Sequence, residues 1–421
     1  MLHTANKRAT LRRGAAERTG YLSPPSRNQS AMIHSSAKWS LVLLSAVGWL
    51  VGCTSANQPA AESEPVESTT FTDLFGRPYE RYRDKLRLPE EEHIYNVKQL
   101  TFGGDNAEAY FSRDGQALVF QASNPAWGDD CDQIYLLDPI EGVAEAPTKI
   151  STGEGRTTCS YFMPGDEQII YASTHVADAN CPAVPRSVDG KYVWPVYETF
   201  DLFVADRAGR LRAQLTDEPG YDAEATVAPD GSRIVFTSDR SGDLELYTML
   251  PDGSDVRQVT DSLGYDGGAF FSPDSKRLVF RASRPKTAEE QSSYTALLKK
   301  HVVQPGQMEL YVCDVDGGNM QQVTKLGGAN WAPFFHPDGD RIIFASNHHV
   351  QDSGGRQFNL FSIRTDGSGL KQITFDDSFD AFPMFSPDGT QLVFSSNRNN
   401  GGTRETNLFI ANWSDTGAPS K

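Results

Sequence analysis

The stretch FSPDGTQLVFSSNR, residues 385–398, contains two short apolar segments on either side of a Pro-Asp-Gly turn at 387–389. Proline fixes φ at the first corner of such a turn, aspartate bonds back to its own backbone, and glycine accepts the positive φ that closes the turn. The segment after the turn alternates as a strand does and ends on an aromatic residue, here from Leu392 to Phe394. The stretch therefore predicts a β-hairpin.

This hairpin pattern occurs six times along the chain. The copies begin at Phe111, Phe162, Val227, Phe271, Phe335 and Phe385. Each copy is followed by a short aromatic strand pattern, and these begin at Ile134, Asp201, Glu245, Glu309, Asn359 and Asn407. A further strand pattern ends in a tripeptide similar to Gln-Leu-Thr, and the tripeptides begin at Gln99, Ile150, Gln214, Gln258, Gln322 and Gln372. Four strands per unit, and a spacing of 44 residues from Asp230 to Asp274, are typical of propeller blades.

The two ends of the repeat array predict how the ring closes. The tripeptide at 99–101 precedes the first hairpin, whereas the last aromatic strand, at 407–412, has no tripeptide after it. Residues 96–101 are therefore predicted to form the outermost strand of the sixth blade, which leaves no open edge. The predicted fold is all-β, a six-bladed β-propeller of four-stranded blades over residues 95–414, closed by an N-terminal strand in the last blade.

The turn, the strand after it and the Gln-Leu-Thr strand resemble the WD-like repeats of the TolB-type propellers over residues 95–414. The resemblance implies the fold, but related propellers serve as binding scaffolds, as partner domains of serine peptidases and as pectate-type lyases. TolB-type proteins also carry a small α/β domain before the propeller, which implies docking to the Tol-Pal envelope system. Only about forty residues separate the predicted processing site from the first blade strand here, so we do not expect that domain.

The N-terminal region predicts export and lipid anchoring. Residues 38–52 contain an apolar stretch of signal-peptide length that ends in Leu-Val-Gly before Cys53. These four residues resemble a bacterial lipobox, which implies cleavage before Cys53 and acylation of this cysteine. The alternative is an ordinary signal peptide that happens to contain a cysteine. We expect translation to start at Met32, so that residues 1–52 form an extension and a signal peptide.

The segment between the processing site and the propeller, residues 53–94, is predicted to be a tether. Its first part is rich in Ser, Ala, Pro and Glu and has no apolar period, which is typical of a flexible linker. A short helix is expected from Phe71, and residues 415–421 are expected to be a disordered tail. Thr54, in place of an Asp, favours the outer membrane, with the propeller facing the periplasm.

The net charge of the chain disfavours some kinds of binding partner. The formal net charge is −16, and residues 1–52 hold seven of the 39 Lys and Arg but one of the 55 Asp and Glu, so the exported part is more acidic still. Such a charge argues against nucleic acid or an anionic membrane surface as the main partner. We expect an envelope protein, peptide or glycan as the partner, membrane contact through the lipid anchor only, and no cofactor.

Nearly all long insertions follow the second strand of a blade, which places them on one face of the propeller. Loops held by a rigid scaffold are where function usually resides. The largest insertion, 174–200, contains Trp194 and Tyr197, which are candidate binding residues because aromatic rings stack on sugars and peptides. The alternative is that both rings pack the loop against its neighbours. The insertion at 284–307 contains a helical pattern from Thr287 to His301 whose apolar residues are expected to be buried.

A second set of candidates lies eight residues before the middle residue of each hairpin turn, which is Asp388 in the last copy, and each innermost strand begins there. Six polar side chains are expected to ring the mouth of the central channel, where carboxylates could hold a cation or the positive end of a peptide. The alternative is that each side chain ties its own loop by hydrogen bonds. The six residues are Asn106, Thr157, Asp222, Asp266, Asn330 and Asp380.

The histidines are the last candidates. His175 and His348 occupy equivalent places in blades two and five, and His349 is next to the latter. These blades face each other across a six-fold ring at roughly 20 Å, given strands about 4.8 Å apart, whereas a zinc–nitrogen bond is about 2.1 Å. We therefore expect no metal. Because no nucleophile elbow, HExxH or P-loop motif is present, a binding scaffold is preferred, and a lyase-like or hydrolase-type propeller enzyme with a site over the channel mouth is the alternative.

The cysteines add one constraint, because an envelope protein lies in an oxidising space. Cys131 and Cys181 fall in loops above adjacent blades and form the candidate disulfide, whereas Cys159 begins an innermost strand. Cys313 lies inside a strand pattern and is expected to be a buried apolar residue.

Overall fold

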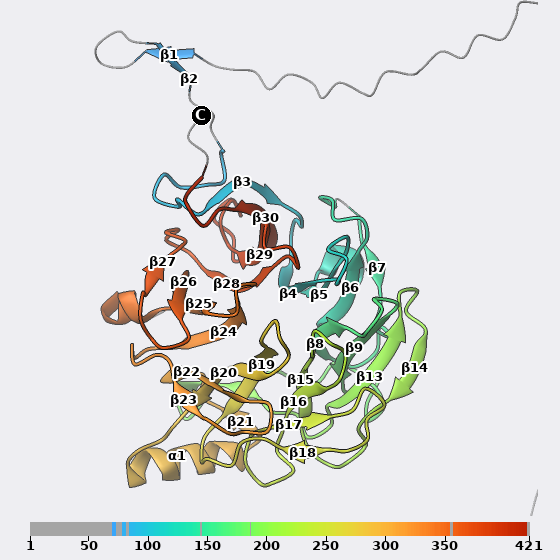
Figure 1. Cartoon of the computed structure of the whole chain (residues 1–421). Coiled ribbons are helices and arrows are strands. Elements are labelled where there is room, and N and C mark those ends of the chain that lie inside the picture. The colour runs from blue at the N-terminus through green and yellow to red at the C-terminus, as the bar shows by residue number, and fades with distance from the viewer. Residues whose placement is uncertain are drawn as a thin grey trace, which may run out of the picture. The chain divides into compact units, whose positions relative to one another are not determined.

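The computed structural model describes residues 70–72, 78–80, 84–143, 145–185, 187–353 and 357–418. Within these residues, six four-stranded antiparallel sheets surround one axis (Figure 1). The innermost strand of each sheet contacts that of the next, and the innermost strand of the sixth sheet contacts that of the first, which closes the ring. The predicted all-β, six-bladed propeller is confirmed.

The first three blades are made of strands in the following order from the axis outward. Blade one contains β4 (Asp105–Phe111), β5 (Leu118–Ser123), β6 (Gln133–Leu137) and β7 (Thr148–Lys149). Blade two contains β8 (Thr157–Phe162), β9 (Gln168–Ser173), β13 (Asp201–Asp206) and β14 (Leu211–Gln214). Blade three contains β15 (Asp222–Val227), β16 (Ile234–Ser238), β17 (Glu245–Met249) and β18 (Arg257–Gln258).

The last three blades repeat this order. Blade four contains β19 (Asp266–Phe271), β20 (Arg277–Ser283), β22 (Met308–Asp314) and β23 (Gln321–Gln322). Blade five contains β24 (Asn330–Phe335), β25 (Arg341–Ser346), β26 (Asn359–Arg364) and β27 (Lys371–Gln372). Blade six contains β28 (Asp380–Phe385), β29 (Gln391–Ser396), β30 (Asn407–Trp413) and, as its outermost strand, β3 (Ile94–Gln99).

The closing strand lies where the repeat array predicts it. β3 pairs antiparallel with β30, with Gln99 opposite Phe409 and Ile94 opposite Trp413. The strand begins two residues before the predicted start. Both ends of the propeller therefore meet in one blade, where β3 covers the outer edge of β30.

Each blade contains an aromatic pair across its two middle strands, which explains the recurring aromatic residues of the sequence. Aromatic rings that face each other in a sheet contribute about 0.5–1.5 kcal/mol beyond their burial. The ring centroids of the six pairs are 5.8–6.2 Å apart. The pairs are Phe120–Tyr135, Tyr171–Phe203, Phe236–Tyr247, Phe280–Tyr311, Phe344–Phe361 and Phe394–Phe409.

The last residue of the Gln-Leu-Thr tripeptides has a defined role in the blades. Its hydroxyl accepts a hydrogen bond of 2.8–2.9 Å from a backbone N–H at the start of the third strand, where the outermost strand leaves the sheet. A buried N–H without a partner would be costly, so the hydroxyl replaces the missing ladder bond. In five blades the residue is the threonine that ends the tripeptide, and in blade one it is the middle residue of the tripeptide at 150–152: Thr101, Thr216, Thr260, Thr324, Thr374 and Ser151.

Residues 84–93, which precede β3, are joined to blade six by a buried ion cluster. Arg398 donates to the carboxylates of Glu91, at 3.0 Å, and Asp380, at 2.8 Å, and these two carboxylates have no exposed side-chain surface. Glu91 also accepts from the N–H of Phe375. Burial raises the pKa of Glu91, against the opposing effect of Arg398. The segment is therefore part of the folded propeller.

Several short elements lie outside the blades. β1 (Thr70–Thr72) pairs with β2 (Pro78–Glu80), so the helix expected from Phe71 is wrong, and β-branched and aromatic residues take the strand conformation they favour. The helix expected in the second large insertion is present as α1 (Ala288–Leu298), capped by Thr287. The described residues also include the 3₁₀ helices η1 (Pro125–Trp127) and η2 (His348–Ser353).

By its internal contacts the chain divides into two units, Met1–Glu67 and Ser68–Lys421. The first unit, with the predicted signal peptide and Cys53, lies outside the described residues, as do residues 419–421 of the predicted tail. Where the structure describes the chain, no helix is long and apolar enough to cross a membrane.

Candidate binding site on the propeller axis

We call the end of the propeller that bears the connections between second and third strands the loop face. Its two largest insertions join each other, because β12 (Trp194–Pro195) pairs antiparallel with β21 (Val302–Val303). Val193 and Leu297 of α1 complete a small buried cluster with Val302. The insertions of blades two and four thus form one body, here called the cap (187–197 and 288–303).

The two aromatic candidates of the cap are packed. Trp194 is half-buried, and its ring centroid lies 5.6 Å from that of Trp331 in blade five, in a T-shaped contact. The hydroxyl of Tyr197 donates to the carbonyl of Ala183 at 2.8 Å. These contacts support the interpretation that both rings hold the cap in place. The exposed ring beside them is Tyr192, which is 64% exposed.

The six polar candidates at the starts of the innermost strands are all buried, with at most 2% of each residue exposed. Each has a partner within the propeller. Asp222, Asp266 and Asp380 form ion pairs with Arg240, Arg284 and Arg398. Asn106 and Asn330 donate to loop carbonyls, and the Thr157 hydroxyl donates to the carbonyl of Asp132. This placement supports the interpretation that each of them ties its own loop.

Two of the joints between blades bring two carboxyl groups together. Asp201 of blade two lies near Asp222 of blade three, and Glu245 of blade three lies near Asp266 of blade four. Burial, and then repulsion from the second carboxylate, raises the pKa of Asp201 to about 6 and that of Glu245 to about 8. Oε2 of Glu245 has no hydrogen-bond partner in the described part of the chain. Near pH 7 a proton on Glu245 therefore reduces the repulsion at its joint, whereas Asp201 takes up a proton only as the pH falls through about 6.

The histidine candidates take the place that arginines hold in other blades. His175 lies 4.3 Å from the ring of Phe203, and His348 lies 4.6 Å from that of Phe361, by ring centroids. Nε2 of His349 is 3.0 Å from an amide oxygen at the start of β26. Burial lowers the pKa of all three histidines, so they are neutral near pH 7. Among the described residues no group of three or more His, Cys, Asp or Glu is placed to hold a metal ion.

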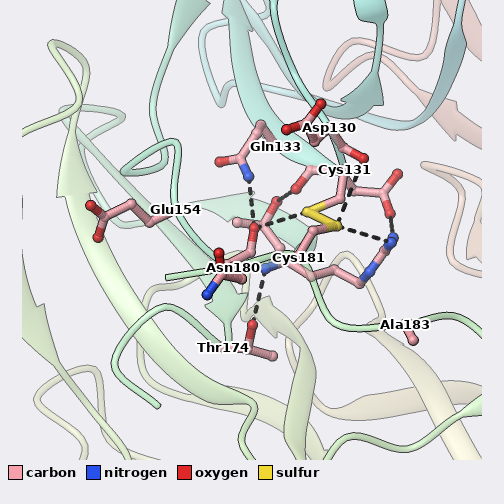
Figure 2. Close-up of a disulfide and its surroundings, with 12 residues drawn as sticks. Asp130, Cys131, Gln133, Glu154, Thr174, Asn180, Cys181 and Ala183 are labelled. Atoms are coloured by element: carbon pink, nitrogen blue, oxygen red, sulfur yellow. Dashed lines mark hydrogen bonds and ion pairs between the residues drawn. A yellow bond between two sulfur atoms is a disulfide. The ribbon is translucent and has the colours of Figure 1, made fainter. Parts of the chain in front are cut away.

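The cysteine candidates are joined. Cys131 and Cys181 form a disulfide with their Cα atoms 5.9 Å apart, which ties the loop of blade one to the first part of the blade-two insertion (Figure 2). The guanidinium of Arg156 donates to Sγ of Cys181 at 3.5 Å. Cys159 is free and half-buried, and Cys313 is free and buried.

The side chains that reach the axis belong to a different position, which sequence reasoning missed. Every innermost strand has a β-bulge two residues after the buried polar position, and the bulge residue has a positive φ of 44–59°. All six bulge residues are half-buried, whereas the residue after each of them is buried. We call this set the bulge ring: Glu108, Cys159, Glu224, Gly268, Ala332 and Phe382.

Aromatic rings fill the axis next to the bulge ring. Tyr110 of blade one lies 5.4 Å from Phe270 of blade four, although these blades are on opposite sides of the ring. The ring centroid of Tyr161 lies 5.6 Å from that of Tyr110. The ring centroid of Phe334 lies 5.3 Å from that of Phe270. These four residues form an aromatic plug, so the bulge ring lies on its loop-face side.

One side of the bulge ring is a closed polar network. Glu224 pairs with Arg281, and its carboxylate also accepts from the Tyr265 hydroxyl at 2.8 Å and from the N–H of Gly268 at 2.9 Å. Burial alone would raise the pKa of Glu224, but the Arg281 charge and these hydrogen bonds lower it. A Cβ atom on Gly268 would meet the guanidinium of Arg281, which explains the glycine at this position. Glu224 is therefore a balanced, ionised group.

Glu108 differs from Glu224 because it forms no ion pair within the described part of the chain, although the charge of Arg281 lowers its pKa. The side chain of Glu108 is hydrogen-bonded to the Cys159 thiol, whose own pKa is raised by burial and by the two glutamates. Burial raises the pKa of Glu108 to about 7, and repulsion from Glu224 and Asp132 adds to the effect. The other part of the bulge ring is apolar, since Phe382 packs edge-on against Trp331 with centroids 4.9 Å apart. The bulge ring is thus polar in blades one to three and apolar in blades five and six, with Phe382 in the blade next to that of Glu108.

A sequence signal for this ring does exist. The bulge residues stand six residues before the middle residue of each hairpin turn, and blade four has the pair Gly267-Gly268 inside a strand, which commonly marks a bulge or a close approach. A non-glycine residue at positive φ leaves no such mark, so the other five positions read as ordinary strand.

Comparisons with known proteins agree with the fold. A family model described as "TolB beta propeller domain" matches residues 197–303 and 301–415, which together make up more than half of the chain. The Tol-Pal system protein TolB of Bordetella pertussis is 42% identical over 53 residues, which cover 13% of this chain and 12% of that protein. The Tol-Pal system protein TolB of Wolinella succinogenes is 21% identical over 272 residues, which cover 64% of this chain and 56% of that protein. The chain thus spans about half, or much less, of the length of these curated relatives.

Solved structures show the same likeness at low identity. A putative TolB from Agrobacterium tumefaciens is 16% identical with a TM-score of 0.44, over 74% of this chain and 91% of that chain. TolB from Acinetobacter baumannii is 18% identical with a TM-score of 0.44, over 75% and 64%. An oligogalacturonate lyase in complex with manganese is 17% identical with a TM-score of 0.40, over 84% and 97%. At these TM-scores the likenesses carry no argument about activity.

Proposed function

The chain belongs to the TolB β-propeller domain family, and on this basis we propose that it is a lipid-anchored binding scaffold of the cell envelope that holds a protein partner on its loop face. The observation that carries the proposal is the asymmetry of the two faces. The disulfide and the cap are both on the loop face, and they hold its two largest insertions in place. Rigid loops on a propeller form a preorganised surface, which favours binding because little order is lost on association.

The loop face also offers the exposed apolar contacts that a partner would use. Tyr192, Val176 and Val184 of the blade-two insertion are 46–64% exposed, and Phe102, between blades six and one, is 55% exposed. Exposed aromatic residues beside polar loops are typical of interface anchors. Binding is favoured over catalysis because Glu224, the carboxylate near the axis whose pKa is lowered, is satisfied by Arg281 and by the Tyr265 hydroxyl.

Site-specific photo-crosslinking in cells tests the scaffold. A photoreactive residue replaces Tyr192 or Phe102 on the loop face, and Met320 or Leu370, each about 40% exposed at the outer turns of the opposite face, serves as the matched control. We expect one discrete crosslinked protein from the loop-face positions and none from the controls. Equal crosslinking from both faces, or none from either, would contradict the proposal.

Cys53 is proposed as the anchor. Each acyl chain contributes about 0.8 kcal/mol per buried CH₂, so two or three chains would hold the acidic propeller to a bilayer that does not otherwise attract it. The variant Cys53→Ser is expected to lose the mature form from detergent-phase membrane extracts, while the propeller still folds. Mass spectrometry of the N-terminal peptide provides the measurement. A wild-type protein that is not acylated and does not begin at Cys53 would contradict the proposed anchor.

A further inference from the structure

We propose that the cap is a lid on the loop face, and that the buried carboxyl group of Glu245 controls how firmly the lid closes. The cap spans blade three, because its two halves are the insertions of blades two and four and they join through β12 and β21. Glu245 stands at the start of β17 in blade three and is 2% exposed. This carboxyl group is therefore buried in the blade that the cap covers.

The two residues directly before Glu245 contact the cap. The Tyr294 hydroxyl of α1 donates to the carboxylate of Asp243. Leu244 is buried in the same apolar cluster as Val303 of the cap. Lifting of the cap breaks both contacts and lets water reach the start of β17.

Trp194 is the part of the cap that reaches the neighbours of the bulge ring. Its ring centroid lies 5.6 Å from that of Trp331, which packs on Phe382 of the bulge ring. The guanidinium of Arg281, which is paired with Glu224 of the bulge ring, lies 5.8 Å from the centroid of the Trp194 ring. The position of the cap therefore controls how open the bulge ring is from the loop face.

The joint beneath the cap contains more carboxyl groups than cations. Arg284 donates through both terminal nitrogens to the carboxylate of Asp266, with 2.8 Å between Nη2 and Oδ2. Asp243 is the second carboxyl group and Glu245 the third, and Oε2 of Glu245 has no hydrogen-bond partner among the described atoms. The joint thus has one guanidinium for three carboxyl groups. The groups around Glu245 are the Asp266–Arg284 and Asp222–Arg240 ion pairs, Asp243, Tyr247, Tyr294 and Tyr311.

A proton on Glu245 therefore favours the closed lid. In the closed state burial, and then repulsion from Asp266 and Asp243, raises the pKa of Glu245 to about 8. When the cap has lifted, water solvates the carboxylate and the pKa moves back toward the usual 4.5. Because the closed state binds the proton more tightly, its advantage is fully present below pH 4.5 and is lost as the pH rises through 8. The ratio of open to closed lids should rise about tenfold between pH 6.5 and pH 8.

Hydrogen exchange followed by mass spectrometry on the full-length protein tests the lid. Peptides that cover α1 and β21 report lifting of the cap, and a peptide of β29 in blade six reports the stability of the propeller itself. We expect the protection of the cap peptides to fall about tenfold between pH 6.5 and pH 8, after correction for the intrinsic pH dependence of exchange. This pH range also avoids the titration of Asp201, whose pKa is about 6. Unchanged protection of the cap peptides, or an equal fall in β29, would overturn the lid.

Variants identify the group that titrates. Glu245→Gln cannot ionise and is expected to remove the pH dependence of cap protection while β29 stays protected. The matched control is Glu309→Gln, because Glu309 holds the comparable place in blade four and accepts from the Asn330 amide. This control should keep the pH dependence of the wild type. A pH dependence that survives in Glu245→Gln, or is lost in Glu309→Gln, would contradict the assignment to Glu245.

A third variant separates the hydrogen bond of the cap from the proton. Tyr294→Phe removes the bond to Asp243, so the cap peptides should exchange faster at both pH values but keep their pH dependence. Loss of the pH dependence in this variant would assign the titration to Asp243 and contradict the proposal. These exchange measurements need no partner, so a cap that does not respond to pH overturns the lid whatever the loop face crosslinks, and it leaves the scaffold intact.

Discussion

The charge of Arg281 is the one near the axis whose removal we expect to reduce stability most. It is 5% exposed, and its main partner, Glu224, is surrounded by hydrogen bonds that require the carboxylate to be ionised. Removal of one member of a buried pair leaves the other uncompensated, whereas removal of both costs much less. Loss of Arg281 or Glu224 alone is therefore expected to lower the free energy of unfolding more than loss of both together.

The variant Arg281→Met is accordingly expected to lower the free energy of unfolding by about 3–5 kcal/mol. The double variant Arg281→Met with Glu224→Gln should recover a large part of this loss, because no ionised carboxylate is then buried alone. Urea unfolding followed by circular dichroism measures both. If the double variant is as unstable as the sum of the two single variants, the pairing does not account for the loss.

Glu245 provides a prediction about pH. Its folded-state pKa is about 8 and its usual value is 4.5, so the stability it contributes is fully present below pH 4.5 and is lost as the pH rises through 8. Besides Asp266, the charged groups around it are Asp243 and Arg284. In Glu245→Gln, which cannot ionise, the melting temperature should fall less between pH 5 and pH 8.5 than in the wild type. Glu309→Gln is the control, because Glu309 is at the comparable joint between blades four and five and accepts from the Asn330 amide. We expect this variant to keep the pH slope of the wild type. Equal pH slopes in Glu245→Gln and the wild type would show that another group titrates.

At the scale of elements, the cap shows how an insertion becomes part of the scaffold. Trp194 lies in β12 and pairs with Val303 of β21. The residue before it, Val193, is buried against Leu297 of α1. Trp194→Ala is expected to lower the free energy of unfolding by about 2 kcal/mol, roughly half the usual loss for a fully buried tryptophan, because the ring is half-buried. Tyr192→Ala, two residues away and 64% exposed, should leave stability unchanged but weaken crosslinking to the partner. A melting temperature that falls equally in both variants would show that Tyr192 is also packed.

Much of the element pattern could be predicted from the sequence, because hairpin turns and alternating strands are local signals. The six blades and the closing strand follow from repeats such as 385–398. The pairing of β12 with β21 could not be predicted, since two-residue strands about a hundred positions apart carry no periodicity. The bulge ring was missed for a related reason. A positive φ at Glu108 or Phe382 is imposed by the neighbouring strands and not by the residue itself. The Arg240 and Arg284 ion pairs, which satisfy two of the predicted ring candidates, also depend on three-dimensional proximity alone.

At the scale of the whole molecule, closure of the ring depends on a strand from the other end of the chain. Truncation of the mature protein to begin after Thr101, which removes β3 and Glu91, should leave β30 with an open edge and Arg398 with one partner fewer. We expect lower thermal stability and the formation of oligomers through the open edge, measured by calorimetry and analytical ultracentrifugation. A truncation that begins at Phe71 keeps both features and should behave as the full mature chain does. Equal stability and a monomeric state in both truncations would contradict the role of β3.

The position of β3 also determines the order of events during synthesis. Thr101 and Leu408, which are hydrogen-bonded in the closed blade, are 307 residues apart in the chain. β3 is synthesised before the strands of blades one to five and its partner β30 after them, so these five blades can form while β3 is still unpaired. Pairing at such a separation is slow because a long loop must close before any contact forms. The edge of β3 is therefore open to other strands until β30 has been made, and the ring cannot close before then.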